Sequence, residues 1–315
     1  MGNIGSMPPS PELVCLGEPM IEFNRPRAGD EHSWLQGFGG DTSNAAIAAA
    51  RQGASVAYLT ALGRDWMGDA FLALWKAEGV ETSGVTHHDT APTGVYFVTH
   101  SEQGHKFDFL RKGSAASLMT PGDLSASHIS SARILHLSAI SQAIGADALA
   151  TCRAAIDIAR AAGVQVSYDT NLRLRLWDLA AARRTIDQTM ALADIALPSL
   201  DDSRQLTGLQ RPDEIVDFYL GLGPRFVALK MGSDGALVAT AERRLHIPPH
   251  RVTAVDATGA GDTFDGAFLA RLLAGDDFET AARYANVAAA LSTEGYGAVA
   301  PIPRQAAVKA ALAPA

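Results

Sequence analysis

A carboxylate stands directly behind a glycine turn in the last quarter of the chain. The stretch reads Ala-Val-Asp-Ala-Thr-Gly-Ala-Gly-Asp-Thr-Phe-Asp-Gly-Ala over residues 254–267, which places Asp262 after Gly259, Ala260 and Gly261. A helix is expected to begin there, and its unpaired N–H groups attract anions, especially phosphates. A carboxylate beside an anion-binding helix start has a chemical reason if it takes a proton from an attacking hydroxyl. We interpret Asp262 as a candidate general base; the alternative is a glycine turn before an ordinary helix.

A second glycine-rich segment, Gly-Phe-Gly-Gly-Asp-Thr-Ser-Asn over residues 37–44, leads into an alanine-rich helix. It is neither a dinucleotide-binding fingerprint nor a phosphate-binding loop with Gly-Lys-Ser/Thr, and taken alone a tight turn explains it equally well. Asp41 and Asn44 offer oxygen acceptors, and Asn44 also offers donors, so both suit sugar hydroxyls. Asp41 or Thr42 is expected to cap the helix that follows.

Together the two segments resemble, in content and order, the two signatures of the PfkB (ribokinase-like) sugar kinases. The similarity continues through residues 45–68 and covers the chain from about 12 to 307. It implies that Asp262 is the catalytic base and that the N–H groups of Gly259, Ala260 and Gly261 stabilise the transferred phosphoryl group. It also implies that the first loop holds the sugar, through Gly40, Asp41 and Asn44.

The same resemblance implies where ATP and its ions bind. The loop Lys-Met-Gly-Ser-Asp-Gly over residues 230–235, which read locally is a hairpin turn, would lie along the nucleotide. Mg²⁺ would ride on the ATP phosphates, and a monovalent cation such as K⁺ would lie near Asp256. Ser199-x-x-Asp202 stands where many relatives carry Asn-x-x-Glu near the magnesium. The nucleotide-binding residues implied are Lys230, Gly232, Ser233, Gly235, Thr258, Gly259, Gly261 and Asn286.

Further strings resemble the 2-keto-3-deoxygluconate kinases within that family. They are Gly-Glu-Pro-Met-Ile-Glu-Phe-Asn at 17–24, Phe-Asp-Phe-Leu-Arg-Lys-Gly-Ser-Ala-Ala-Ser at 107–117 and Tyr-Asp-Thr-Asn-Leu-Arg-Leu-Arg-Leu-Trp at 168–177. A guanidinium matches a carboxylate in a bidentate way, so arginines suit a sugar acid, although each could instead form a surface ion pair. Phe109 lacks the hydroxyl of a tyrosine common at that position. The sugar-binding residues implied here are Tyr96, Phe109, Arg111, Asn171 and Arg173.

The expected reaction is therefore ATP-dependent phosphorylation of 2-keto-3-deoxygluconate at its 6-hydroxyl. Two alternatives stay open. The first is a kinase of the same family that acts on fructose, ribose or a nucleoside. The second is a non-catalytic sugar- or nucleotide-binding protein, which the intact Asp262 argues against, because a carboxylate beside phosphate does not help binding alone.

Composition narrows the partners of this 315-residue chain. A net charge of −8 argues against a broad nucleic-acid surface, and no apolar run is long enough to span a bilayer. Cys15 and Cys152 have neither metal-binding nor redox spacing, so a cytoplasmic location is expected. The first residues lack the features of a signal peptide. We expect residues 1–10 to be a disordered tail or a cloning remnant and residues 11–315 to form one kinase domain.

Alternating strand and helix patterns predict a three-layer α/β/α sandwich on a mostly parallel sheet. Residues 19–35 and 93–111 break this rhythm and are expected to form a small β-sheet lid, with Tyr96 and Phe109 facing the sugar. Val95 and Phe97 would lie on the other face and join a homodimer. Strands are expected near 13–16, 55–60, 133–137, 164–168, 195–197 and 226–229, and helices near 42–51, 66–78, 146–162, 261–274 and 279–293.

Overall fold

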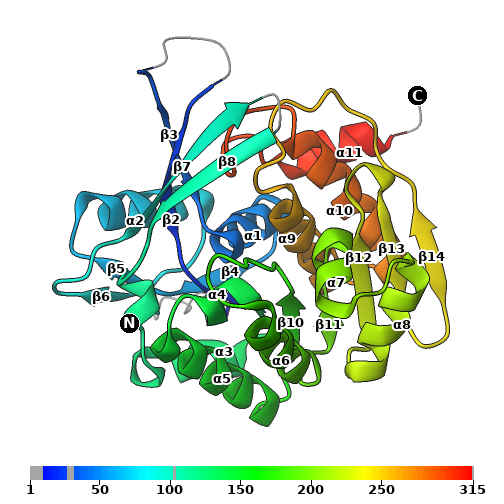
Figure 1. The fold of residues 1–315 in the computed structure, drawn as a ribbon, viewed down its shortest axis with the longest axis horizontal. Helices are drawn as coiled ribbons and strands as arrows, with labels where there is room; N and C mark the ends of the chain where they lie inside the picture. Colours follow the sequence, from blue (N-terminus) through cyan, green and yellow to red (C-terminus); the bar gives the residue numbers. More distant parts are fainter. Residues whose placement is uncertain (1–9, 27–31, 102–103, 314–315) are drawn as a thin grey trace, which may run out of the picture.

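The computed structural model describes residues 10–26, 32–101 and 104–313, and the sheet at its centre has eight strands (Figure 1). The tail expected at residues 1–10 lies, but for Ser10, outside the described residues. The strand order is β14-β13-β12-β11-β10-β9-β1-β4. The six strands from β4 to β12 run parallel to one another. The strands β13 and β14 complete the sheet through antiparallel pairs. The strands are β1 (Leu13–Leu16), β4 (Val56–Leu59), β9 (Ile134–Ser138), β10 (Gln165–Asp169), β11 (Ile195–Ala196), β12 (Phe226–Lys230), β13 (Ala236–Ala239) and β14 (Arg244–Ile247).

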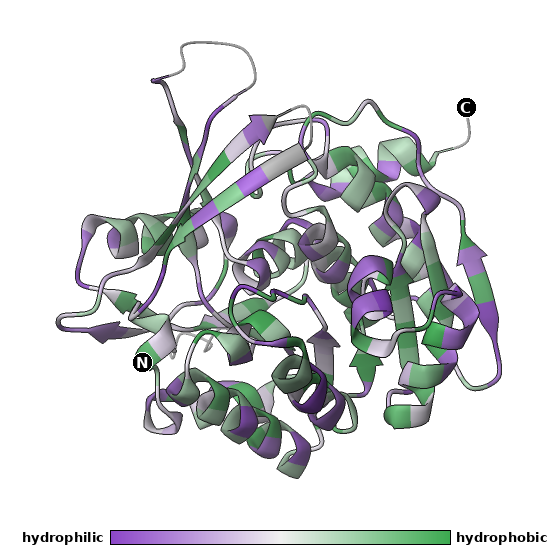
Figure 2. Cartoon of the chain, in the orientation of Figure 1, coloured by the Kyte–Doolittle hydropathy of each residue, from purple (hydrophilic) through white to green (hydrophobic). Residues whose placement is uncertain are grey.

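Alternate residues of the strands pack against two different hydrophobic cores, which is what makes the fold three-layered. On β1, Leu13 and Cys15 join the core beneath α1, α9 and α10, whereas Val14 and Leu16 join the core beneath α5, α6 and α8. The strands β12 and β13 are accordingly apolar along their length (Figure 2). The three-layer prediction is confirmed. Among the described residues, every helix is too short or too polar to span a bilayer.

Helices cover both faces of this sheet. The first core lies under α1 (Asp41–Arg51), α2 (Trp66–Glu78), α9 (Ala260–Leu273), α10 (Phe278–Ser292) and α11 (Gln305–Leu312). The second lies under α3 (Ala126–Ser131), α4 (Ala139–Ala143), α5 (Ala146–Ala161), α6 (Leu179–Met190), α7 (Leu200–Thr207) and α8 (Pro212–Leu222). The expected helices begin and end within a residue of those observed, because glycines and caps mark their ends.

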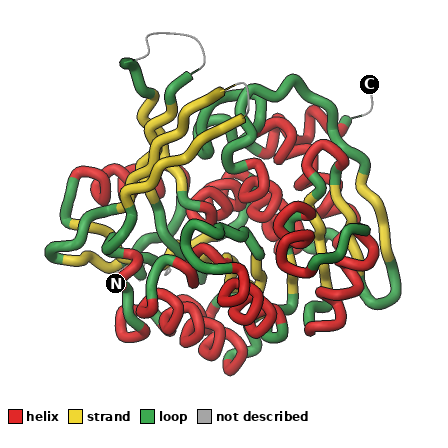
Figure 3. Tube along the Cα trace, in the orientation of Figure 1, coloured by secondary structure: helices red, strands yellow, loops and turns green. Residues whose placement is uncertain are grey.

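A separate four-stranded sheet forms the predicted lid and stands apart from the helical body (Figure 3). Its order is β3-β2-β7-β8, with β2 and β7 parallel and both outer pairs antiparallel. Residues 27–31 and 102–103, at the ends of its hairpins, lie outside the described residues. A third, two-stranded sheet joins β5 (Ala61–Gly63) to β6 (Thr86–His88). The lid strands are β2 (Met20–Asn24), β3 (Leu35–Gly39), β7 (Gly94–Ser101) and β8 (Gly104–Leu110).

The lid has two chemically different faces. Tyr96 stacks on Phe109 on the inner face, with ring centroids 5.9 Å apart. Phe97 packs on the outer face between Phe23 and Trp34, with both centroid distances at 5.5 Å. This is the alternation that the sequence of β7 predicts.

The predicted cap of α1 is wrong. Gly40, with φ of 101°, occupies the cap position, and Asp41 is the first helical residue. The Asp41 carboxylate is drawn instead to Asn171 and Ser138, which donate hydrogen bonds to it from the end of the sheet. Contacts far apart in sequence have overridden the local capping preference.

Asp65 joins a helix of the body to the first residues of the lid. One carboxylate oxygen accepts from Gly68 N at 2.8 Å and caps α2, and the other accepts from Thr93 N at 2.8 Å, just before β7.

We therefore expect Asp65→Ala to lower the free energy of unfolding by about 2–3 kcal/mol, since it removes a helix cap and a second charge-assisted hydrogen bond. Chemical denaturation measures the loss. Asp277→Ala is the matched control, because Asp277 caps α10 through Thr280 N alone and should cost about 1 kcal/mol. Equal losses in both variants would contradict the second role of Asp65.

Candidate active site

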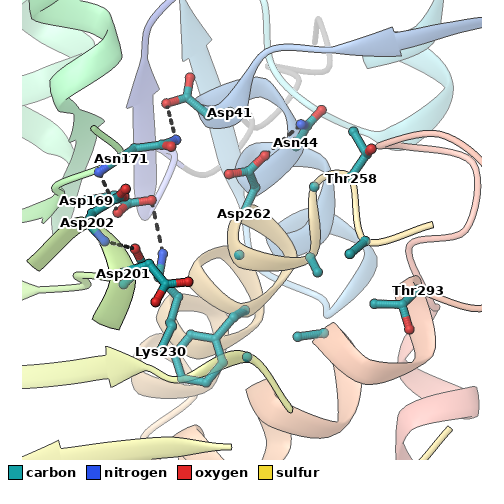
Figure 4. A pocket seen from close by; sticks show the side chains of 18 of the residues that line it. Asp41, Asn44, Asp169, Asn171, Asp201, Asp202, Lys230, Thr258, Asp262 and Thr293 are labelled. Carbon is teal, nitrogen blue, oxygen red and sulfur yellow. Dashed lines mark hydrogen bonds and ion pairs between the residues drawn. The ribbon is translucent and has the colours of Figure 1, made fainter. Parts of the chain in front are cut away.

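A cavity of ≈ 1260 Å³ lies between the carboxyl ends of the parallel strands, the start of α9 and the lid. Ligands bind at this edge in open α/β sheets. Asp41, Asn44 and Asp262 lie close together at one end, while Thr293 lies at the far side (Figure 4). All predicted site residues except Asp256 line it: Gly40, Asp41, Asn44, Tyr96, Phe109, Arg111, Asn171, Arg173, Lys230, Gly232, Ser233, Gly235, Thr258, Gly259, Ala260, Gly261, Asp262 and Asn286.

Asp262 lies in the first turn of α9 and is held by Asn44, whose Nδ2 donates to its Oδ2 at 2.8 Å. Burial and, after it, the nearby Asp41 carboxylate raise the pKa of Asp262, and the Asn44 hydrogen bond opposes them; the net pKa is about 7. A carboxyl group with a pKa near neutrality can accept a proton and release it again, as a general base must.

The turn before Asp262 requires glycine at its first position. Gly259 has a φ of 76°, and a Cβ placed on it would come 2.9 Å from the Ala298 carbonyl oxygen. The backbone therefore reverses sharply against residue 298 and then enters α9. Gly259, Ala260 and Gly261 line the cavity, and the Ala260 N–H donates to the Ala257 carbonyl oxygen at 3.2 Å. The start of a helix leaves N–H groups without intrahelical acceptors, which favours a phosphate there.

Polar groups converge at the end of the cavity next to α1. Asn171 Nδ2 donates to Asp41 Oδ2 at 3.0 Å, and Ser138 Oγ donates to the same oxygen. Burial raises the pKa of Asp41 despite these hydrogen bonds. The structure thus brings the first glycine-rich loop and the segment after β10 together, as the resemblance implied.

The two predicted arginines lie at this end but differ in their partners. The Arg111 guanidinium is held by the buried Glu18, to which its Nε donates at 2.7 Å. Arg173 donates to the Leu172 carbonyl oxygen at 2.8 Å and, within the described part of the chain, forms no ion pair. Arg173 is therefore the more available of the two for an anionic ligand.

Tyr96 and Phe109 form the inner surface of the lid over the cavity. Tyr96 is 4% exposed, and its hydroxyl donates to Glu22. Arg111 and Arg175 both place their guanidinium carbons over the Phe109 ring, at 5.6 and 5.7 Å from its centroid.

Lys230, predicted to contact the nucleotide, is held between two buried aspartates. Its Nζ donates to Asp169 at 3.0 Å and to both oxygens of Asp265 at 2.9 Å. Burial opposes the charge of Lys230, but the two carboxylates raise its pKa overall. The ammonium lies 3.7 Å from where a Cβ on Gly261 would be, directly beside the phosphate-binding turn.

The loop after β12 and helix α10 line a further part of the cavity. Gly232, Ser233 and Gly235 form the loop after β12, and Asn286 on α10 donates to the Pro248 carbonyl at 2.8 Å. Asp256 is buried behind this wall, and its oxygens accept from Asn24, Thr258 and Gly297.

Sequence reasoning missed several residues that line or support the cavity. Asp169 and Arg175 belong to the segment already singled out at 168–177, so their position after a strand was the available signal. Asp265, three residues beyond Asp262, could have been recognised as lying one helical turn below it. Asp202 was not missed, since the resemblance implied it near the magnesium; it lines the cavity and accepts from Leu172 N at 3.1 Å.

Comparison with known proteins agrees with this geometry. The model of the pfkB family carbohydrate kinases matches residues 10–305. A 2-dehydro-3-deoxygluconokinase of Bacillus subtilis (strain 168) is 32% identical, covering 91% of this chain and 90% of its own. That of Thermoproteus tenax is 33% identical, covering 93% and 92%. A fructokinase of Oryza sativa subsp. japonica is 32% identical, covering 93% and 95%.

Solved structures show the same fold. The PfkB protein from Polaromonas sp. JS666 superposes with a TM-score of 0.86 at 31% identity, covering 96% of this chain and all of its own. A fructokinase double mutant from Vibrio cholerae O395, in fructose, ADP and potassium ion bound form, gives 0.87 at 27% identity, covering 98% and 100%. The family and fold predictions are confirmed: the chain belongs to the pfkB family of carbohydrate kinases and is an ATP-dependent sugar kinase.

Proposed function

We propose that this kinase phosphorylates 2-keto-3-deoxygluconate (2-dehydro-3-deoxygluconate) at its 6-hydroxyl. The observation that carries the proposal is Arg173, a guanidinium that lines the cavity and forms no direct ion pair among the described residues. Its acidic neighbour is Asp202, whose pKa is raised by burial and lowered by the Arg173 charge. Arg111 adds a second guanidinium there, although Glu18 offsets its charge. Relatives named for this activity, at 32–33% identity, support the same substrate.

In the proposed mechanism the 6-hydroxyl oxygen attacks the γ-phosphorus while its proton passes to Asp262, and ADP leaves. Asn44 holds the base in place, and its own Oδ1 is buried without a hydrogen-bond partner among the described residues. A substrate hydroxyl would supply that partner. The N–H groups of Gly259, Ala260 and Gly261 stabilise charge on the transferred group. The lid excludes water, which limits wasteful hydrolysis of ATP.

The cavity fits ATP with Mg²⁺. Its volume and its helix start suit a triphosphate, while Asp169 and Asp202 place carboxylates near the wall. No group of three or more metal-binding side chains occurs among the described residues, which fits an ion that keeps its waters and rides on the phosphates. Asp202 would contact Mg²⁺ through a water molecule, because its side chain is one carbon shorter than that of the glutamate that many relatives carry there. Asp256 is our candidate for holding a monovalent cation.

Fructose is the second candidate substrate. The rice relative is a fructokinase at 32% identity, and the Vibrio cholerae structure contains fructose. Fructose has no carboxylate, so it would leave the Arg173 guanidinium without an anion. That difference makes Arg173 the residue that separates the two substrates.

Asp262→Asn should lower kcat by about 10²–10⁴-fold and leave the Kd of an ATP analogue nearly unchanged, because only the proton acceptor is lost.

In the wild type, only the carboxylate form of Asp262 is active. Since its pKa is raised to about 7, kcat/KM should fall about ten-fold per pH unit below 7 and level off above it. Steady-state kinetics from pH 5.5 to 9 measure both; a flat profile would argue against Asp262 as the base.

Arg173→Leu should raise KM for 2-keto-3-deoxygluconate at least about ten-fold and change KM for fructose little, since one charge-assisted hydrogen bond is lost only with the acid. Kinetics with acidic and neutral sugars measure the contrast. Arg183→Leu is the control, because Arg183 also donates to a backbone oxygen but lies on α6. Equal losses for both sugars would contradict carboxylate recognition.

We also propose a homodimer formed through the outer face of the lid. Phe97, Trp34 and Leu110 lie there, with Leu110 68% exposed, and such an apolar patch is unusual on a monomer. The sequence predicts that Val95 contributes too, but the structure packs it partly against the body core.

The double change Phe97→Ser, Leu110→Ser should therefore convert the dimer to monomers, because it replaces apolar contact area with hydroxyls. Light scattering at micromolar concentration measures the mass. Leu192→Ser, which changes an exposed leucine in the turn after α6, is the control. A monomeric wild type would rule out the dimer without affecting the assignment as a kinase.

A further inference from the structure

The inner face of lid strand β2 carries two buried polar side chains that the proposed reaction does not use. Glu22 and Asn24 are each 1% exposed. Glu22 lies against Gly297 in the loop that follows α10, and Asn24 contacts Asp256, which accepts a hydrogen bond from the same Gly297. Burying an acid and an amide is costly unless each has partners, so their contacts show what they stabilise.

Asn24 joins the lid to the segment before α9. Its Nδ2 donates to Asp256 Oδ2 at 3.1 Å, across 232 positions of sequence. Its Oδ1 accepts from His100 Nε2 on β7 at 2.8 Å, which fixes the orientation of the carboxamide. The lid therefore supplies one of the donors that Asp256 needs in its buried position.

Asp256 connects Asn24 to the turn Thr258–Gly261 through further hydrogen bonds. Its Oδ1 accepts from the Thr258 backbone N at 3.0 Å and from Thr258 Oγ1 at 2.7 Å. Its Oδ2, which Asn24 also contacts, accepts from Gly297 N at 3.0 Å. One carboxylate thus holds together the lid, the loop after α10 and the first residue of the turn.

Glu22 makes a second, parallel connection. It accepts hydrogen bonds from the hydroxyl of Tyr96, from the side chain of Asn24 and from the backbone N–H of Ala298, so the two connections also touch each other on the lid. The Ala298 carbonyl oxygen in turn lies 2.9 Å from where a Cβ on Gly259 would be. The segment 297–298 therefore touches the lid on one side and the turn on the other.

We propose that Glu22 and Asn24 are positioning residues that couple closure of the lid over the sugar to the order of the turn Thr258–Gly261. Opening the lid would remove the Asn24 donor from the buried Asp256 and the Ala298 N–H donor from Glu22, so the closed lid and the ordered turn stabilise each other. A sugar that favours the closed lid must then tighten ATP binding, and ATP must tighten sugar binding by the same factor. The inference rests on the sugar kinase activity and not on which sugar is the substrate.

The coupling can be measured directly by titration calorimetry. The Kd of a non-hydrolysable ATP analogue is determined with and without saturating 2-keto-3-deoxy-D-gluconate. We expect the sugar to tighten the analogue about ten-fold in the wild type. In Asn24→Leu and in Glu22→Leu this factor should fall to below about two-fold, with the Kd in the absence of sugar changed far less.

Three further variants separate coupling from general damage to the lid. Gln36→Leu makes the same kind of change on lid strand β3, opposite Phe23 on the outer face, and should keep the full factor. Tyr96→Phe removes only the hydroxyl that donates to Glu22 and should lower the factor while the protein remains folded. Glu22→Gln retains an acceptor for Ala298 N and should restore most of the factor lost in Glu22→Leu.

A wild type without coupling would overturn the proposal, and so would full coupling in Asn24→Leu and Tyr96→Phe. Failure of the substrate assignment looks different, since 2-keto-3-deoxygluconate would then not be phosphorylated. In that case D-fructose, if it is turned over, replaces the sugar acid in the same titration, and the expected factors are unchanged.

Discussion

The proposed base, Asp262, has to remain ionisable beside a helix start that attracts anions, and the charged groups around it bear on this requirement. Asp262 lies within a buried group of acids that includes Asp41 and Asp169, and burial with like charge raises its pKa. Left uncorrected, these effects would keep the carboxyl protonated. The Asn44 hydrogen bond and the Lys230 charge act in the other direction, which holds Asp262 near the pH at which a base works well.

Lys230 also prevents the floor of the cavity from repelling phosphate. Burial raises the pKa of Asp265, whereas the Lys230 ammonium holds the pKa of Asp169 below its usual value in spite of burial. The Lys230 ammonium therefore offsets part of the negative charge of these two acids. The partial positive charge at the start of α9 can then act on a phosphate against a weaker opposing field.

The sequence contains enough to predict the layers, the lid and a set of site residues of which all but Asp256 line the cavity. Glycines and alternating apolar residues are local signals, and they mark where elements begin, end and face. The partners of individual side chains are not local. Asp41 looks like a helix cap until Asn171, 130 positions away, is seen to hold it, and the ion pair between Arg111 and Glu18 joins residues 93 apart. Such pairings follow from the topology.

The sugar end shows how a lost contact can be replaced within the same fold. Phe109 cannot donate the hydrogen bond that a tyrosine would. Its ring is instead covered by the guanidinium groups of Arg111 and Arg175, and Arg175 also donates to the Phe107 carbonyl oxygen at 2.5 Å. Arg175 comes from the body and Phe107 from the lid, so this contact holds the lid strand β8 beside the sugar. Cationic groups thus gather where a carboxylate would bind, while the aromatic ring keeps water from the hydroxyls.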